Sequence, residues 1–200
     1  MAALILAFDT SGPHCTAALT RGEDVIAQAS VDMAKGQAEH LMGMLGEVLA
    51  AGEVTYQALT AIGVGVGPGN FTGIRISVSA ARGLALGLSI PAIGVSVFEA
   101  YADPDARELL TLPAPRDTRY AQSFHGYAPH GPARHLTLDQ FGHERLPERQ
   151  IKVDRTTLAR SISQVALRKL NAGAIGAPKP LYVKALDAAP PRDAGPKILP

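Results

Sequence analysis

The sequence has no excess of charge of either sign. Its 200 residues include 19 Lys and Arg against 18 Asp and Glu, which gives a formal net charge of +1. A chain without a large positive field does not hold a phosphate backbone tightly by itself. We therefore expect any role with RNA to depend on a partner protein.

Cysteine and long apolar runs are also scarce. Cys15 is the single cysteine, which excludes an internal disulfide framework and fits a reducing compartment, and we interpret it as a small buried strand residue. The apolar start, residues 2–8, is far shorter than a membrane span, has no basic n-region and runs directly into Asp9. It predicts a first strand of a cytoplasmic protein rather than a signal peptide or a membrane anchor.

The first half of the chain, residues 1–101, predicts a mixed sheet with helices on its faces. The unbroken apolar run at 4–8 is typical of a central strand, and the turn at 21–24 separates two more strands of an antiparallel meander. The later elements are a helix from residue 38 to about 52, a strand at 59–66, a helix at 72–88 and a strand at 91–97. This order is that of the ribonuclease-H/actin-like fold, a topological analogy that is weak evidence about activity.

The second half, residues 102–200, predicts a smaller and partly irregular C-terminal lobe of reduced size. Six prolines between residues 104 and 147 interrupt it. Residues 109–114 and 118–124 predict a hairpin, and apolar spacing between 158 and 170 predicts a helix. Three further expectations are that 126–150 has no regular period, that 181–183 forms a strand, and that the proline-rich tail from Pro178 is extended.

The segment Gly67-Pro68-Gly69-Asn70-Phe71-Thr72-Gly73 invites a phosphate-loop interpretation, because successive glycines can aim N–H groups at an anion beside a helix N-terminus. The segment matches neither the G-x-G-x-x-G register nor the Walker lysine position. A tight strand-to-helix turn that needs positive φ, with Asn70 or Thr72 as the cap, is the favoured alternative to ligand contact.

Asp9-Thr10-Ser11, at the end of the first strand, occupies the place where actin-like ATPases hold a carboxylate near the nucleotide. Either a vestigial nucleotide loop or an Asp that caps a turn explains it. Four histidines lie in the irregular polar stretch, where solvated surface histidine is the expected interpretation: His125, His130, His135 and His143.

The helix predicted at 72–88 is unusual for its small residues. Two glycines inside a helix cost roughly 1 kcal/mol each relative to alanine, so a packing reason is expected. The small surface fits either an internal helix–helix contact or a subunit interface. Arg75 and Arg82 fall on one side of it.

Three segments resemble the TsaB (YeaZ) family: residues 4–11, Glu39-His40-Leu41, and the highly specific run Gly67–Ile76. The resemblance covers roughly the first 100 residues. Beyond them, residues 117–120 resemble the Asp-Ala-Arg hairpin of the family with Thr in place of Ala, and 180–184 resemble its closing strand. Asn70 stands where the family usually has Ser, and the second half is shorter than usual.

The resemblance implies a non-catalytic subunit that binds and activates TsaD, with the ATPase TsaE joining them, for transfer of a threonylcarbamoyl group to N6 of adenosine 37 of tRNA. It implies contact with tRNA only through the partner, no cofactor, no metal site and a homodimer when the chain is alone. The contact surface is expected on the first two helices. Its residues are Leu41, Met42, Met44, Leu45, Arg75, Ser79 and Arg82.

Two other functions remain open from the sequence. One is a metallopeptidase, because the family has been called glycoprotease-like. The other is a small-molecule kinase of the actin-like fold, suggested by Asp9.

Overall fold

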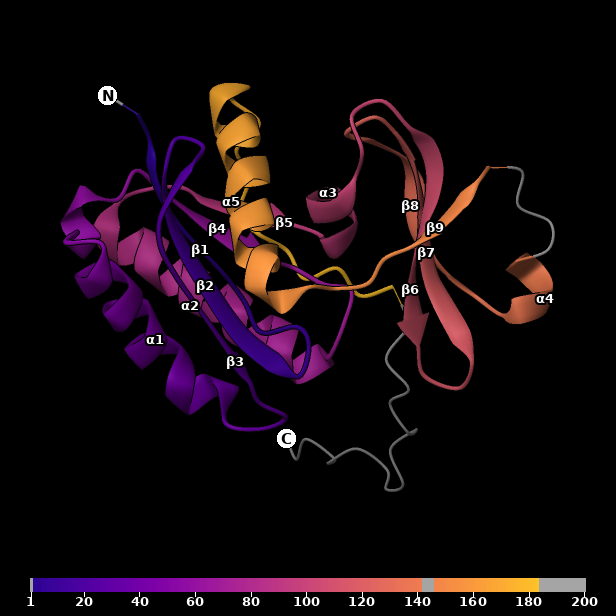
Figure 1. Cartoon of the computed structure of the whole chain (residues 1–200), viewed down its shortest axis with the longest axis horizontal. Helices are drawn as coiled ribbons and strands as arrows, with labels where there is room; N and C mark the ends of the chain where they lie inside the picture. Colours follow the sequence, from indigo (N-terminus) through magenta and orange to yellow (C-terminus); the bar gives the residue numbers. More distant parts are fainter. Residues whose placement is uncertain (1, 142–145, 184–200) are drawn as a thin grey trace, which may run out of the picture.

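The computed structural model describes residues 2–141 and 146–183, and it contains two sheets that lie next to each other (Figure 1). The first sheet has the strand order β3-β2-β1-β4-β5. Its strands are β1 (Leu4–Asp9), β2 (His14–Arg21), β3 (Asp24–Asp32), β4 (Ala61–Gly65) and β5 (Ala92–Val95). β1 pairs antiparallel with β2 and parallel with β4, so the meander and the crossover strands meet at β1.

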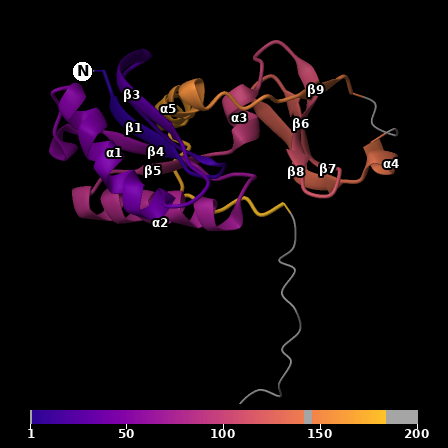
Figure 2. The same ribbon diagram turned by 60° about the horizontal axis from the view of Figure 1, so that its bottom comes forward.

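Helices cover both faces of this sheet. The helices α1 (Gln37–Ala51) and α2 (Phe71–Leu88) lie side by side on one face, and α5 (Arg155–Asn171) lies on the other (Figure 2). Side chains alternate between the faces of a strand, so Leu6 and Phe8 pack with α1 and α2 while Ile5 and Ala7 pack with α5.

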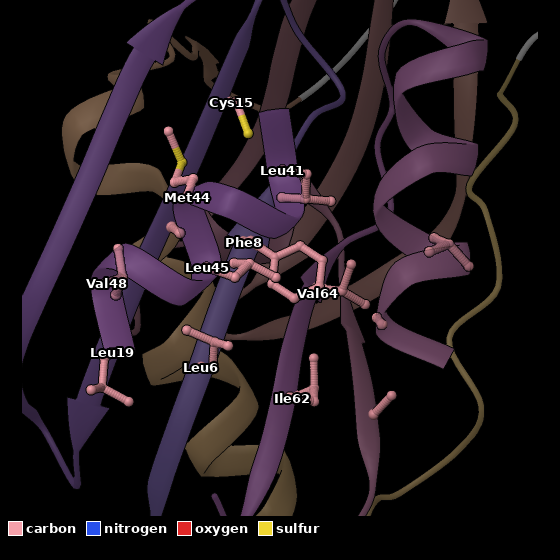
Figure 3. Close-up of a cluster of buried hydrophobic side chains, with 14 of the residues drawn as sticks. Leu6, Phe8, Cys15, Leu19, Leu41, Met44, Leu45, Val48, Ile62 and Val64 are labelled. Carbon is pink, nitrogen blue, oxygen red and sulfur yellow. The ribbon is translucent and has the colours of Figure 1, made fainter. Parts of the chain in front are cut away.

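The core beneath α1 and α2 is the larger of the two. Figure 3 shows Leu41 and Leu45 of α1 beside Phe8 of the sheet, with Met44 of the same helix nearer to Cys15. Cys15 is buried in the same cluster, as predicted. Burial, followed by the charge of Asp9, raises the pKa of the Cys15 thiol to about 11.

The second sheet has the order β8-β7-β6-β9. Its elements are β6 (Arg107–Ala114), β7 (Thr118–His125), β8 (Ala128–Leu136), α4 (Leu138–Phe141) and β9 (Glu148–Gln150). One face packs against the short helix α3 (Val97–Tyr101) through Phe98, Leu110 and Phe124. A short 3-10 helix, η1 (Tyr56–Ala58), precedes β4.

The predicted mixed α/β fold and its element order through residue 97 are confirmed, as are the hairpin and the helix of the second half. One expectation was wrong: residues 181–183 are not a strand, and the Leu181 N–H donates to the Val66 carbonyl at 2.8 Å. Residues 126–150, which show no regular period in sequence, contain β8, α4 and β9. The tail from residue 184 and His143 lie outside the described residues.

The predicted division at residues 101 and 102 stays a prediction, and α5, from the second half, packs on the first sheet. Among the helices that the structure describes, none has both the length and the apolar character needed to cross a membrane.

Candidate functional site

The glycine-rich turn packs against the end of β1. The Asn70 N–H donates to the Ser11 carbonyl at 2.7 Å, and the Asn70 side-chain oxygen accepts from the Gly73 N–H at 2.9 Å. Asn70 is therefore the N-cap of α2, one of the two caps that the sequence offered. The N–H groups of Asn70 and Gly73 thus already have partners within the protein.

Glycine is required in this turn by close approach. A Cβ at Gly73 would overlap the carbonyl oxygen of Thr10, and a Cβ at Gly69 would overlap that of Ser11. Gly67 has a φ of 95°, which side chains rarely adopt. Packing and conformation account for all three glycines without a ligand.

The Asp9-Thr10-Ser11 turn is held by internal hydrogen bonds. Oδ1 of Asp9 accepts from the Ser11 N–H at 2.9 Å and the Ser11 hydroxyl at 2.9 Å, and lies 2.7 Å from Nε2 of His14. Asp9 is 0% exposed, and its Oδ2 has no hydrogen-bond partner among the described residues. The geometry makes Asp9 part of a buried network, and the vestigial nucleotide loop stays a prediction.

A cavity of about 1030 Å³ lies between the two sheets. Both halves line it, with Ser11, His14 and the N-terminus of α1 on one side and Tyr120 on the other. Its ionisable side chains have both signs: His14, Lys35, Glu39, Lys152 and Arg155, the last paired with Asp32. Within residues 2–141 and 146–183, no three His, Cys, Asp or Glu side chains cluster closely enough to hold a metal ion.

Of the residues predicted to contact a partner, some are buried in the core and others are exposed to solvent. Leu41, Met44 and Leu45 are 0–1% exposed in the core, so their side chains are not available to a partner on this surface. The apolar stripe of α1 points to the sheet because packing on the strands buries it. Met42 lies on the opposite side of α1 and is 46% exposed.

The three residues predicted on α2 are all exposed. The Arg75 guanidinium lies 4.9 Å from the centre of the Phe71 ring. Nε of Arg82 donates to the Pro178 carbonyl at 3.0 Å, and Ser79 lies between the two arginines on the same helix. The contact predictions for Met42, Arg75, Ser79 and Arg82 remain predictions.

The sequence singled out Gly83 and Gly87 as small but could not tell which face of the helix they occupy. They are exposed, and a Cβ added to either, or to Gly43 of α1, would meet no neighbouring atom within 4 Å. Leu86 is 83% exposed on α2. The outer surface of α1 and α2, which we call the small-residue face, therefore comprises Met42, Gly43, Ser79, Gly83, Leu86 and Gly87.

Comparison with known proteins gives sequence matches over part of the chain. The family model of TsaD, tRNA N6-adenosine threonylcarbamoyltransferase, matches residues 31–114. The tRNA threonylcarbamoyladenosine biosynthesis protein TsaB of Buchnera aphidicola is 37% identical over 102 residues, which are 51% of this chain and 48% of that protein. The Escherichia coli TsaB is 36% identical over 92 residues, or 46% and 39% of the two chains. The chain thus matches less than half the length of these curated relatives.

A solved structure from Pseudomonas aeruginosa, described as similar to the peptidase YeaZ, superposes with a TM-score of 0.73. It is 24% identical, and the alignment covers 91% of this chain and 100% of that one. This likeness shows a shared fold across both halves. The sequence matches to TsaB proteins place this chain in the TsaB (YeaZ) family.

Proposed function

We propose that this chain is a non-catalytic subunit that binds and activates a TsaD-type enzyme, which transfers a threonylcarbamoyl group to N6 of adenosine 37 of tRNA. A TsaE-type ATPase joins them in a ternary complex, in the cytoplasm. In the absence of the enzyme, the chain forms a homodimer. The proposal extends the names of the relatives, which describe threonylcarbamoyladenosine biosynthesis.

The small-residue face is the observation that supports this proposal most strongly. Two adjacent helices present glycines with open space above them, beside an exposed Leu86. Two internal glycines in α2 reduce its helical stability by roughly 1 kcal/mol each, and no neighbour among the residues that the structure describes requires them. A helix from a second protein can approach such a face closely, which gives the glycines a function.

Two arginines beside the small-residue face, Arg75 and Arg82, favour a protein partner with acidic groups. Arg75 and Arg82 are exposed, and contacts within the chain hold each of them, to the Phe71 ring and to the Pro178 carbonyl. Arginines held in place lose less side-chain entropy when they bind carboxylates.

The buried Asp9 network supports the non-catalytic part of the proposal. Within the turn beside the cavity, Oδ1 of Asp9 is engaged by Ser11 and His14, and the capped N-terminus of α2 donates inward. A carboxylate that is 0% exposed is poorly placed to touch a substrate.

Reconstitution tests the proposal. The TsaD-type and TsaE-type proteins of the same cell would be assayed for tRNA modification with and without this chain, and we expect modification only with it. Equal modification without the chain would refute the proposal. Tight binding of ATP–Mg²⁺ to the chain alone, abolished by Asp9→Ala, would favour a small-molecule kinase instead.

A further inference from the structure

Charge is distributed unequally between the two halves of the chain. Residues 1–101 contain 4 Lys and Arg against 8 Asp and Glu, and residues 102–200 contain 15 against 10. The halves have formal charges of −4 and +5, which the net charge of +1 conceals. The expectation that any role with RNA depends on a partner protein rested on this net charge.

Part of the basic character of the second half lies on the outward face of its sheet. Phe124 and Leu110 point inward toward α3, so residues one step away along each strand point outward. Arg107 and His125 are such residues and are directly paired across β6 and β7. His130 on β8 pairs with Ser123, which shares the outward face of β7 with His125.

The two histidines stack on each other. Their ring centres are 4.4 Å apart with 22° between the planes, and His130 is exposed. Partial desolvation, followed by the charges of His130 and Arg107, lowers the pKa of His125. At neutral pH His125 thus presents an uncharged ring beside the Arg107 guanidinium.

A second aromatic and basic pair lies at the same end of the sheet. The turn between β7 and β8 places Tyr127 with its ring centre 3.9 Å from the guanidinium carbon of Arg168, and Tyr127 is 45% exposed. Glu108, the neighbour of Arg107 in sequence, turns to the inner face and binds Arg149 at 2.6 Å. We call Arg107, His125, His130, Tyr127 and Arg168 the histidine–arginine patch.

We infer that the histidine–arginine patch binds RNA directly, and that its ligand is the tRNA on which the assembled complex acts. Flat rings accept stacked bases without regard to sequence, and arginines beside them contact phosphates. Exposed aromatic side chains at the end of a sheet form a surface on which unpaired bases can stack. The identity of the RNA rests on the proposed function, and it replaces the expectation of indirect contact alone.

The test compares a double variant, Arg107→Ala with His130→Ala, against Arg21→Ala, a control on an exposed arginine at the end of β2 in the first half. The dissociation constant of the assembled complex for a tRNA transcript would be measured by fluorescence anisotropy at several salt concentrations. Loss of a stacking ring and of a phosphate contact should weaken binding about tenfold, and loss of one arginine should lower the salt slope by about 1. Arg21→Ala should change neither.

Unchanged tRNA affinity and salt slope in an intact complex would overturn the inference. So would weaker assembly of the double variant with the TsaD-type subunit, because the patch would then be a protein contact. Unfolding curves establish that the variant is folded.

If the wild-type chain forms no complex, the proposed function fails, and ultraviolet cross-linking of the chain alone to a single-stranded oligoribonucleotide decides the inference separately. Cross-links in the peptide that contains His125 and His130 support it. Cross-links elsewhere, or none, overturn it.

Discussion

The two halves of this chain bury their cores by similar means but have opposite exteriors. The first half has an acidic balance and exposes two helices with open glycines, whereas the second half has a basic balance and exposes a strand surface with stacked histidines. Close helix packing suits a protein partner, and rings beside arginines suit RNA. Under the two proposals above, one chain joins an enzyme to its nucleic acid substrate without catalysing the reaction.

The interiors also differ in how completely they are closed to water. In the first half, the His14–Asp9 pair is almost wholly buried, with side chains 6% and 0% exposed. In the second half, Glu108 is 6% exposed but its partner Arg149 is 43% exposed. We expect the first half to tolerate polar truncation less well than the second.

The largest expected difference concerns these two pairs. His14→Ala leaves the buried Asp9 carboxylate without its imidazole, so it should lower the free energy of unfolding by about 3 kcal/mol. Arg149→Ala should lower it by about 1 kcal/mol, because water reaches the site and screens the charge. Urea denaturation at pH 7 measures both, and a larger loss for Arg149→Ala would reverse the comparison.

The next largest expected difference is in the stability lost when a glycine of each half is replaced by alanine. Gly73→Ala forces a methyl group onto the Thr10 carbonyl and should lower the free energy of unfolding by about 2 kcal/mol. Gly131→Ala in β8 meets no atom within 4 Å and should cost only about 1 kcal/mol, for its φ of 87°. Thermal unfolding of both variants checks the order, and equal losses would mean that the turn can shift away from β1.

The smallest expected difference is in how the stability contributed by two helix caps depends on pH. Asn70 caps α2 with a neutral amide, so Asn70→Ala should cost about 1 kcal/mol both at pH 7 and at pH 3. Asp154 caps α5, and hydrogen bonds from the Thr156 hydroxyl and N–H lower the pKa of its carboxylate. A carboxylate with a lowered pKa stabilises the fold above its unfolded pKa and loses that contribution as the pH falls through the folded value.

Asp154→Asn keeps the cap but cannot titrate. Relative to this variant, the wild-type chain should therefore lose stability only below about pH 4. Denaturation curves between pH 3 and pH 7 measure the difference. A constant difference over that range would show that the charge of Asp154 does not contribute to the cap.

The first half was predictable from sequence because its signals are local. Apolar period, turn residues and the Gly67–Ile76 run define the strands, both helices and the turn between β4 and α2. β8 escaped prediction because most of it is exposed and contains two prolines, so it has no apolar alternation. The return of α5 to the first sheet depends on contacts far apart in sequence, which no local pattern records.

The candidate site was only partly predictable for a related reason. An apolar stripe on a helix shows that the stripe is buried but not by what, so Leu41, Met44 and Leu45 fitted a partner as well as a core. The sequence of α2 likewise did not show that Ala81 is buried, at 0% exposed, whereas a Cβ at Gly83 would have open space around it. The stacked histidines needed the strand register, which brings β7 and β8 together.

The small-residue face has one direct test, the affinity of the chain for a TsaD-type subunit with and without an arginine at position 83. Gly83→Arg has room in the free chain and improves helix propensity, so the variant should fold as stably as the wild type. Ala172→Arg is the matched control, because it adds the same side chain to an exposed position at the end of α5, on the opposite face of the sheet.

Isothermal titration with the TsaD-type subunit should give equal affinities for the wild-type chain and Ala172→Arg. Gly83→Arg should bind at least about 100-fold more weakly, because a buried unpaired charge costs several kcal/mol. Equal binding of Gly83→Arg and the wild type would contradict the assignment of this face to the partner.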